Sequence, residues 1–372
     1  MGGRTRKAFR GHCLVVAVGL MPSVWAAAAA AADPDGEPGS EATATEPRFA
    51  VSGQLRSRFN YLDNTFRNTT NGFSVIHARW RRRDVPELQA FYTLPVGRLP
   101  NGLDPTALRD DRFELDQERV AVRFWGMAVE GWSPIKGYDL DLFVLGLEER
   151  DQRLIPSRNR ELITLGYALK RRVRGWQINL EAVYQFGDSR ADVETTTDLT
   201  HRSWSLHSHL RRRFDMRFAP ILTLRYDYAR GDRVPDDRRN ERFDPLYGAR
   251  RFELGPSGIF GLCERSKLMS PGVSLSIAPL PRTRPLTGYR VAWLAISRDA
   301  LTTAGLRDPS GRSSDLLGQF FEYRLRWDLF LDRLQLETGG VYLRKSRFFD
   351  PVGDATNRDN TVYAYLQATL RS

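Results

Sequence analysis

The sequence has few cysteines and no long hydrophobic segment beyond its N-terminus. Only two cysteines occur in 372 residues, Cys13 and Cys263. Cys13 lies in a segment that we interpret as cleaved, so no intramolecular disulfide is expected and a small disulfide-stabilised exported domain is excluded. No later run approaches the roughly eighteen apolar residues of a transmembrane helix. With 27% charged residues, the chain is also too polar for a helical membrane protein.

Acidic residues are outnumbered, and lysine is scarce among the basic ones. The chain has 56 Lys and Arg against 45 Asp and Glu, a net charge of +11, and Lys supplies only Lys7, Lys136, Lys170, Lys267 and Lys345. A codon bias toward G and C would explain this excess of arginine. The alternative is a surface or channel that binds carboxylate or phosphate through the forked guanidinium. No recognisable nucleic-acid motif is present, so we expect no nucleic-acid partner.

Residues 1–32 have the pattern of a secretory signal peptide. Four basic residues within positions 4–10 precede an apolar run from about Leu14 to Trp25, and an alanine tract then offers a cleavage site before Asp33. An uncleaved anchor is the alternative, but the apolar run is short and ends in small residues. Residues 33–47 are acidic, contain Pro and Gly and lack periodicity, which predicts a flexible periplasmic lead-in. We expect the folded domain over residues 48–372.

Most of the remaining chain alternates between apolar and polar residues. In "FFEYRLRWDLFLDRLQLE" (320–337), aromatic and aliphatic residues occupy every second position, and charged residues stand between them. The same period recurs in "GWQINLEAVYQF" (175–186) and "LTLRYDYA" (222–229). Period two predicts β-strands with one apolar face and one ionic face. One such strand would also suit a soluble sandwich, so the connections have to decide.

Short and long connections alternate when they are counted back from the C-terminus. The short ones lie near 331–333, 280–286, 212–218 and 171–175, and the long ones near 346–360, 299–314, 230–269, 188–200 and 149–158. Tight periplasmic turns and extended external loops are typical of outer-membrane barrels. We therefore predict an all-β fold, a transmembrane antiparallel up-and-down β-barrel of about 14 strands (18 at most), in the outer membrane of a Gram-negative bacterium. The strands are expected to begin near 50, 73, 87, 112, 138, 159, 175, 201, 217, 270, 286, 316, 331 and 361.

Residues 224–279 resemble the alginate-export family of outer-membrane proteins. A Tyr-Ala-x-Gly-Asp corner (228–232), an acidic Asp/Arg/Asn loop (236–240) and Phe-Asp-Pro-Leu (243–246) carry the resemblance, together with residues 328–348 and the ending "VYAYLQATLR". The resemblance covers roughly 175–372 and implies an export channel for an anionic polysaccharide. The family's barrels have eighteen strands, and outer-membrane strands usually finish on Phe. This chain has a short N-terminal third and ends on Ser372.

The alternation places a set of arginines on the ionic faces of the strands, where they would line the pore. These are Arg56, Arg58, Arg123, Arg211, Arg225, Arg290, Arg324 and Arg326. Rings of arginine and lysine are typical of anion pores, so we expect an electropositive constriction. The alternative is a structural role in which the arginines pair with acids on neighbouring strands, namely Glu181, Asp227, Glu322 and Asp328.

The loop 230–269 is rich in both signs of charge. Either it folds into the lumen as a gate, through Asp232, Asp236, Asp237 and Asp244, or it is a solvated external loop. His207 and His209 stand two apart on one strand face, but a metal site needs further ligands and none follows at a fixed spacing. We therefore expect no metal, no cofactor and no catalytic residues, and the protein is not expected to be an enzyme.

These observations predict an outer-membrane channel that exports alginate or a related uronate polymer through an arginine-lined pore. A porin-like uptake channel for small anions or oligosaccharides is the alternative, because the same fold and lining would serve it. The expected partners are the anionic polysaccharide, outer-membrane lipids and periplasmic scaffold proteins for polysaccharide export. The barrel itself is expected to be monomeric.

Overall fold

The computed structural model describes residues 15–20, 54–62, 72–80, 86–97, 117–118, 120–151, 157–193, 195–234, 237–247, 265–297, 299–301, 306–307, 314–329, 333–352 and 359–371. Fourteen strands of nine or more residues run through these parts of the chain. They are β2 (Gln54–Leu62), β3 (Gly72–Trp80), β4 (Glu87–Gly97), β6 (Val122–Ile135), β7 (Tyr138–Glu149), β8 (Glu161–Val173), β9 (Trp176–Arg190), β10 (Asp198–Arg213), β11 (Ile221–Ala229), β13 (Leu268–Ser276), β14 (Thr283–Leu294), β17 (Leu316–Leu329), β18 (Leu334–Lys345) and β19 (Thr361–Arg371).

Five shorter strands and one helical turn accompany them. They are β1 (Val15–Leu20), β5 (Gln117–Glu118), β12 (Arg239–Asn240), β15 (Ala300–Leu301), β16 (Leu306–Arg307) and α4 (Phe349–Val352). No helix in the described segments is long and apolar enough to cross a membrane.

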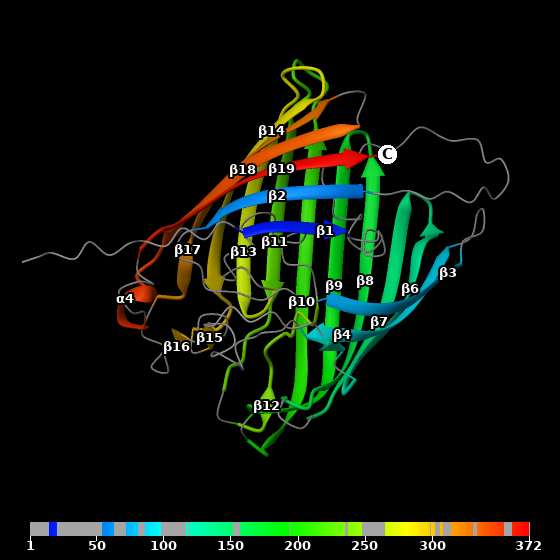
Figure 1. Cartoon of the computed structure of the whole chain (residues 1–372), viewed down its shortest axis with the longest axis vertical. Helices are drawn as coiled ribbons and strands as arrows, with labels where there is room; N and C mark the ends of the chain where they lie inside the picture. The colour runs from blue at the N-terminus through cyan, green and yellow to red at the C-terminus, as the bar shows by residue number, and fades with distance from the viewer. Residues whose placement is uncertain are drawn as a thin grey trace, which may run out of the picture.

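The long strands form one antiparallel up-and-down sheet that wraps into a barrel (Figure 1). Each long strand from β3 to β19 pairs with the next long strand in sequence. The last strand, β19, pairs with β2, for example through Gln367 and Arg58, and no ladder in the described residues pairs β2 with β3. The predicted β-barrel of about fourteen strands is confirmed, and its strand starts differ from the predicted ones by at most about ten residues.

The free edge of β2 is covered by β1, with Val15 opposite Asn60 and Leu20 opposite Leu55. These residues fall within the predicted signal peptide, which stays a prediction. The other long strands pair with the next long strand in sequence. β1 occupies the edge of β2 where β3 would pair in the same way.

The two faces of the sheet differ as the alternation predicts. Apolar side chains such as Leu165, Tyr184, Leu224 and Trp327 project from the outer face and are 46 to 48% exposed. Polar side chains between them, such as Gln185, are buried on the inner face. The outer face is therefore the one that meets lipid, as in other transmembrane barrels.

Tight turns close one end of the barrel. Arg174 and Gly175 connect β8 to β9 and have φ of 46° and 78°. Positive φ at both central residues is the requirement of a type I′ hairpin turn, which Gly meets without strain. The longer connections all lie at the other end, which we call the loop end. The end with tight turns corresponds to the periplasmic side of an outer-membrane barrel.

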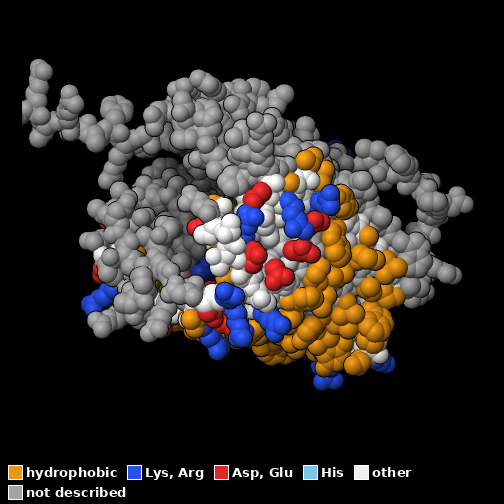
Figure 2. Space-filling model, turned by 90° about the horizontal axis from the view of Figure 1, so that it is seen from below, with side chains coloured by type: hydrophobic (Ala, Val, Ile, Leu, Met, Phe, Trp, Pro, Cys, Tyr) orange, Lys and Arg blue, Asp and Glu red, His pale blue; other side chains and the backbone are white. Residues whose placement is uncertain are grey.

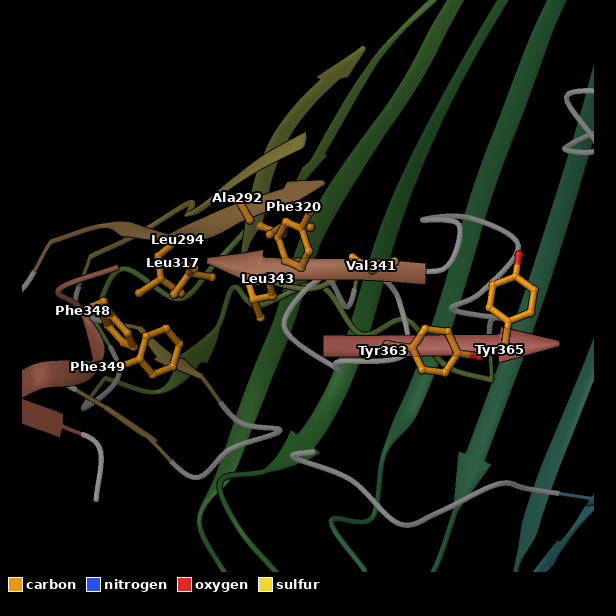
Figure 3. Packing of buried hydrophobic residues seen from close by; sticks show 11 residues of the cluster. Ala292, Leu294, Leu317, Phe320, Val341, Leu343, Phe348, Phe349, Tyr363 and Tyr365 are labelled. Atoms are coloured by element: carbon orange, nitrogen blue, oxygen red, sulfur yellow. The ribbon is translucent and has the colours of Figure 1, made fainter. Parts of the chain in front are cut away.

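Buried apolar side chains concentrate inside the loop end rather than along the whole wall. Phe348 and Phe349, from the β18–β19 connection and α4, pack on lumen-facing residues of the neighbouring strands (Figure 3). Leu294, Leu317 and Leu343 belong to the same cluster. These apolar side chains cover the inner wall of β14, β17, β18 and β19 near the loops.

Candidate functional site

A row of basic side chains lies on the inner face of β10, β11, β14 and β17. Burial alternates along these strands, and the basic residues share the inward parity of buried neighbours such as Ser205, Thr223 and Phe320. The row contains the predicted residues Arg211, Arg225, Arg290, Arg324 and Arg326. We call these five residues the basic row.

Some members of the basic row are neutralised by neighbouring acids. The Arg290 guanidinium donates to Asp227 Oδ2 at 2.6 Å and to Ser270 Oγ at 3.3 Å, and both ionic groups are almost fully buried. Arg326 pairs with Glu337 at 3.3 Å. A buried pair of this kind holds its arginine in place, because breaking it would leave a charge unpaired. Arg290 and Arg326 therefore have the structural role that was the alternative to lining the pore, namely pairing with acids on neighbouring strands.

Arg225 differs, because no ion pair or hydrogen bond of its guanidinium is found within the described residues. Its strand neighbour in register is Gly272 on β13, and the Arg290 side chain lies over this glycine, with Nε 3.6 Å from the position of a Cβ. Glu322 Oε1 on β17 is likewise buried and accepts no hydrogen bond in the described parts of the chain. A guanidinium without a bonded partner keeps its donors for a solute, which the paired arginines do less readily.

The other predicted arginines divide into two groups. Arg56 and Arg58 lie in register opposite Thr369 and Gln367, whose side chains are inward, but the side chains of β2 are outside the described residues. Arg123 lies on the outer face, where its side chain is 54% exposed and 3.4 Å from Glu148. The inward orientation expected for Arg123 is therefore corrected.

The physical reason lies in the neighbours of Arg123. Val122 and Phe124 are buried in an apolar cluster with Leu147 and Leu162, and the Phe124 ring lies 5.2 Å from that of Tyr247. An inward loop therefore covers this part of the inner wall, so the apolar face of β6 faces the lumen here. The sequence alternation marks which residues share a face but not which face is inside.

The two predicted inward histidines are inward, and the first one has a defined partner. His207 Nδ1 is 2.6 Å from Asp227 Oδ1, so Asp227 joins this ring to Arg290. The His207 and His209 rings contact each other at 5.9 Å. Within the residues that the structure describes, no three His, Cys, Asp or Glu side chains come together in a way that could hold a metal ion.

An acidic region on the inner face was not predicted from the sequence. Gln89 Nε2 donates to Glu87 Oε1 at 2.8 Å and to Glu130 Oε2 at 3.0 Å, which joins β4 to β6. Asp141 on β7 pairs with Lys170 on β8. We call Glu87, Glu130 and Asp141 the acidic row. Two long strands separate β7 from β10 and four separate β17 from β4, so the two rows lie on opposite sides of the wall (Figure 1).

Residues 230–234 and 237–247 fold against the inner wall at the loop end, and we call them the inner loop. Asp244 accepts from Arg160 at 2.7 Å, and its backbone N–H donates to Gln185 Oε1 at 3.0 Å. Ser203 Oγ on β10 donates to the Glu241 carbonyl at 2.7 Å. Since Gln185 and Ser203 are inward residues of β9 and β10, the loop lies inside the barrel wall.

Apolar contacts complete this docking. Phe243 is buried with Val183 and Ala229, and Leu246 packs with Tyr247 against the Phe124 cluster. Of the four aspartates predicted to form a gate, Asp232 is buried, Asp244 is partly buried, and Asp237 is exposed. Asp236 lies outside the described residues.

Two carboxylates of the inner loop have opposite electrostatic environments. Burial raises the pKa of Asp232 to about 6, against the attraction of Arg242 and with added repulsion from Asp299. Burial also disfavours the charged form of Asp244, but Arg160 outweighs it and holds the pKa of Asp244 below its ordinary value. Figure 2 views the molecule from the end where β12 lies and shows acidic and basic side chains mixed in the middle, beside a continuous hydrophobic area.

Comparison with known proteins gives one family and a set of distant structures. The model of a family described as alginate export matches residues 54–362. No curated protein matches the chain.

The solved structures that resemble the chain share little sequence with it. They include OccD3 (OpdP) from Pseudomonas aeruginosa, with 13% identity, a TM-score of 0.49 and coverage of 87% of this chain and 75% of that one. The outer membrane protein opdK from Pseudomonas aeruginosa shows 11% identity, a TM-score of 0.47 and coverage of 87% and 77%. OccK5 (OpdH) from the same organism shows 9% identity, a TM-score of 0.48 and coverage of 87% and 79%.

Proposed function

Because the chain belongs to the alginate-export family of outer-membrane channels, we propose that it exports an anionic polysaccharide, alginate or a related uronate polymer, along its basic row. The observation that carries this proposal is Arg225 on the inner face, whose guanidinium forms no ion pair or hydrogen bond within the described residues. A guanidinium binds a carboxylate through two hydrogen bonds, and a uronate polymer presents one carboxylate on every sugar.

The spacing of the basic row suits a chain that moves. Arg324 and Arg326 lie two residues apart on one strand, about 7 Å at the usual rise of about 3.3 Å per residue. Arg324 stands in register between Leu286 on β14 and Gly339 on β18. Several weak sites in sequence allow a polymer to pass from one to the next, whereas one tight site would retain it.

The acidic row gives the proposed passage a preferred side. A polyanion is attracted to the basic row and repelled by Glu87, Glu130 and Asp141 across the lumen. Neutral oligosaccharides have no such preference. The proposed channel therefore selects by charge along one wall rather than by a complete ring of cations.

The inner loop has a place in this proposal as the gate of the loop end. It is fixed by ion pairs and apolar contacts, so its release would widen the exit without changing the barrel wall. Periplasmic scaffold proteins for export remain the proposed partners at the end with tight turns.

Single-channel recording in planar bilayers tests the proposal. We expect an anion-selective current that uronate oligomers block, while neutral oligosaccharides of equal length do not. Arg225→Ser should weaken the block severalfold, and Arg239→Ser, on the exposed part of the inner loop, should not. Equal block by neutral and anionic oligomers, or no effect of Arg225→Ser, would contradict the proposal and favour a general uptake pore.

A further inference from the structure

Arginines and aromatic rings adjoin one another on the outer face at the end with tight turns. Arg171 is near the end of β8, Arg174 is in the β8–β9 turn, and Arg212 is near the end of β10. Tyr138 begins β7 and Trp176 begins β9. We call these five residues the basic–aromatic rim.

Arg171 and Arg212 lie on the lipid-facing rows of their strands. Arg171 has the parity of the exposed Leu165 and Tyr167 on β8, and Arg212 has the parity of the exposed Trp204 on β10. Charged residues on these rows are unfavourable in the middle of the bilayer, but near a strand end they cost about 1 kcal/mol or less. At that depth the guanidinium can reach the headgroups.

Each of these two arginines is held over an aromatic ring. The Arg171 guanidinium carbon lies 4.5 Å from the Tyr138 ring centroid, and its Nη1 donates to the Tyr138 hydroxyl. Arg212 lies 5.0 Å from the Trp176 ring. Tyrosine and tryptophan are enriched at the membrane interface, so the rings place the arginines at headgroup level.

The guanidiniums keep unused donors. Arg171 Nη1 donates to the Tyr138 hydroxyl and Nε is buried, which leaves the N–H groups of Nη2 for a ligand. Arg212 Nη1 donates to the Arg174 carbonyl, which leaves its other N–H groups. No carboxylate of the described chain forms an ion pair with Arg171, Arg174 or Arg212. A guanidinium without a protein counter-ion at this depth is suited to a phosphate.

We propose that the basic–aromatic rim binds the phosphate of an anionic phospholipid in the membrane leaflet at the end with tight turns. Arg171 and Arg212 stand two strands apart and two residues out of register, about 12 Å between Cα atoms at the usual strand spacing and rise, which two arginine side chains can span. Trp176, on the strand between them, lies in register with Arg212 and Val173. One phosphate can therefore be contacted from both sides while the acyl chains lie along the apolar outer face.

Charge near the rim favours an anion and not a neutral lipid. Arg172, Arg213 and Arg217 are exposed at the same end, and Asp215 is the acid within the β10–β11 turn. An acidic protein partner would also be attracted here. The lipid is favoured because Arg171 and Arg212 lie on lipid-facing rows, where a protein docked below the membrane does not reach.

Tryptophan quenching by brominated lipid tests this proposal with two reporters in the full barrel. One variant keeps only Trp176 and the other only Trp327, which lies on the lipid-facing row of β17 opposite Thr283 and Leu336. Both are reconstituted in phosphatidylcholine vesicles with increasing brominated phosphatidylglycerol or brominated phosphatidylcholine. We expect Trp176 to prefer phosphatidylglycerol by about fivefold for each arginine at the surface, and Trp327 to show no preference.

Arg171→Gln with Arg212→Gln, in the Trp176 variant, should abolish the preference, and Lys at both positions should retain part of it. Heat-modifiable migration on a gel checks that each variant is folded. Equal quenching by the two lipids at Trp176, or an equal preference at Trp327, would overturn the proposal even if the double variant does not fold. A preference of Trp176 for phosphatidylglycerol that the folded double variant keeps would also overturn it, because the two arginines would then not bind the lipid.

Discussion

Arg242 forms a two-point ion pair with Asp299, a carboxylate that is completely buried. Arg242 Nε lies 2.9 Å from Oδ1 and 3.1 Å from Oδ2 of Asp299, and Nη2 also contacts Oδ1. Asp299 further accepts from the Asp232 backbone N–H at 2.9 Å. The pair therefore joins the inner loop to the β14–β17 connection, two segments that are distant in sequence.

Asp299→Asn should release the inner loop. The substitution leaves the Arg242 guanidinium without its counter-ion in a largely buried site, which costs roughly 3 kcal/mol. The barrel wall does not depend on this pair, so the change should be local. We expect faster trypsin cleavage at the exposed Arg238 and Arg239, with unchanged heat-modifiability of the barrel. Asp215→Asn, in a turn at the opposite end, is the control, and equal cleavage of the two variants would contradict this prediction.

The docking of the inner loop should weaken as the pH rises from about 4 to 6. The pKa of Asp232 is raised to about 6 by burial, so the docked loop binds this proton more tightly than the released loop does. A group with a raised carboxyl pKa gives stability that is lost as the pH rises through that pKa. Asp244 has a lowered pKa, so its contribution changes only at lower pH.

Asp232→Asn should remove this pH dependence and stabilise the loop at pH 7. Hydrogen exchange of residues 230–247, corrected for the intrinsic effect of pH, measures the stability of the docked loop at each pH. Asp237→Asn is the matched control, because Asp237 is exposed in the same loop. If Asp232→Asn leaves the pH dependence of exchange unchanged, another titrating group causes it and the prediction is wrong.

Much of the fold could be predicted from the sequence because the lipid-facing rows are nearly uninterrupted. Trp176, Ile178, Tyr184 and Phe186 alternate with polar residues along β9, and all four are exposed on the outer face. Turn residues such as Arg174 and Gly175 then indicate where one strand ends and the next begins. These signals are local, and each strand carries its own copy.

The features that could not be predicted depend on contacts between distant segments. Tyr247 covers Phe124 from the inside, which reverses the apparent faces of β6 and moves Arg123 outward. The acidic row was missed because Glu87 and Glu130 come together only through the register of β4 and β6. The ion pair of Arg242 with Asp299 has no sequence signal at all, since charged residues are frequent in both loops.

Glu322→Gln should increase anion selectivity. Glu322 precedes Arg324 by two residues on the inner face of β17, so its charge attracts cations to the basic row. One unit charge at about 8 Å in water contributes about 0.5 kcal/mol, which corresponds to roughly a twofold change in the occupancy of each ion. The reversal potential under a salt gradient reports the change. Glu148→Gln, on the outer face beside Arg123, is the control, and a shift of equal size there would contradict this assignment.

Neutralising Glu87 and Glu130 of the acidic row should also make the channel more anion-selective. It should reduce discrimination between charged and neutral oligomers less than removing Arg225 does. Glu87 and Glu130 stand opposite each other in register, and a single amide, that of Gln89, donates to both. Their charges repel a polyanion from β4 and β6 without binding it, whereas Arg225 is expected to contact its carboxylates directly. Glu87→Gln with Glu130→Gln should therefore shift the reversal potential toward the equilibrium potential of the anion. The block by uronate oligomers should stay within about twofold of its original strength. A repulsive charge on the far wall changes the rate at which a polyanion enters more than the time for which it stays bound. Recordings of both quantities in one bilayer separate the two effects. If the double variant abolishes oligomer block as Arg225→Ser is expected to, the polymer contacts the acidic side of the wall and the passage follows β4 and β6 instead.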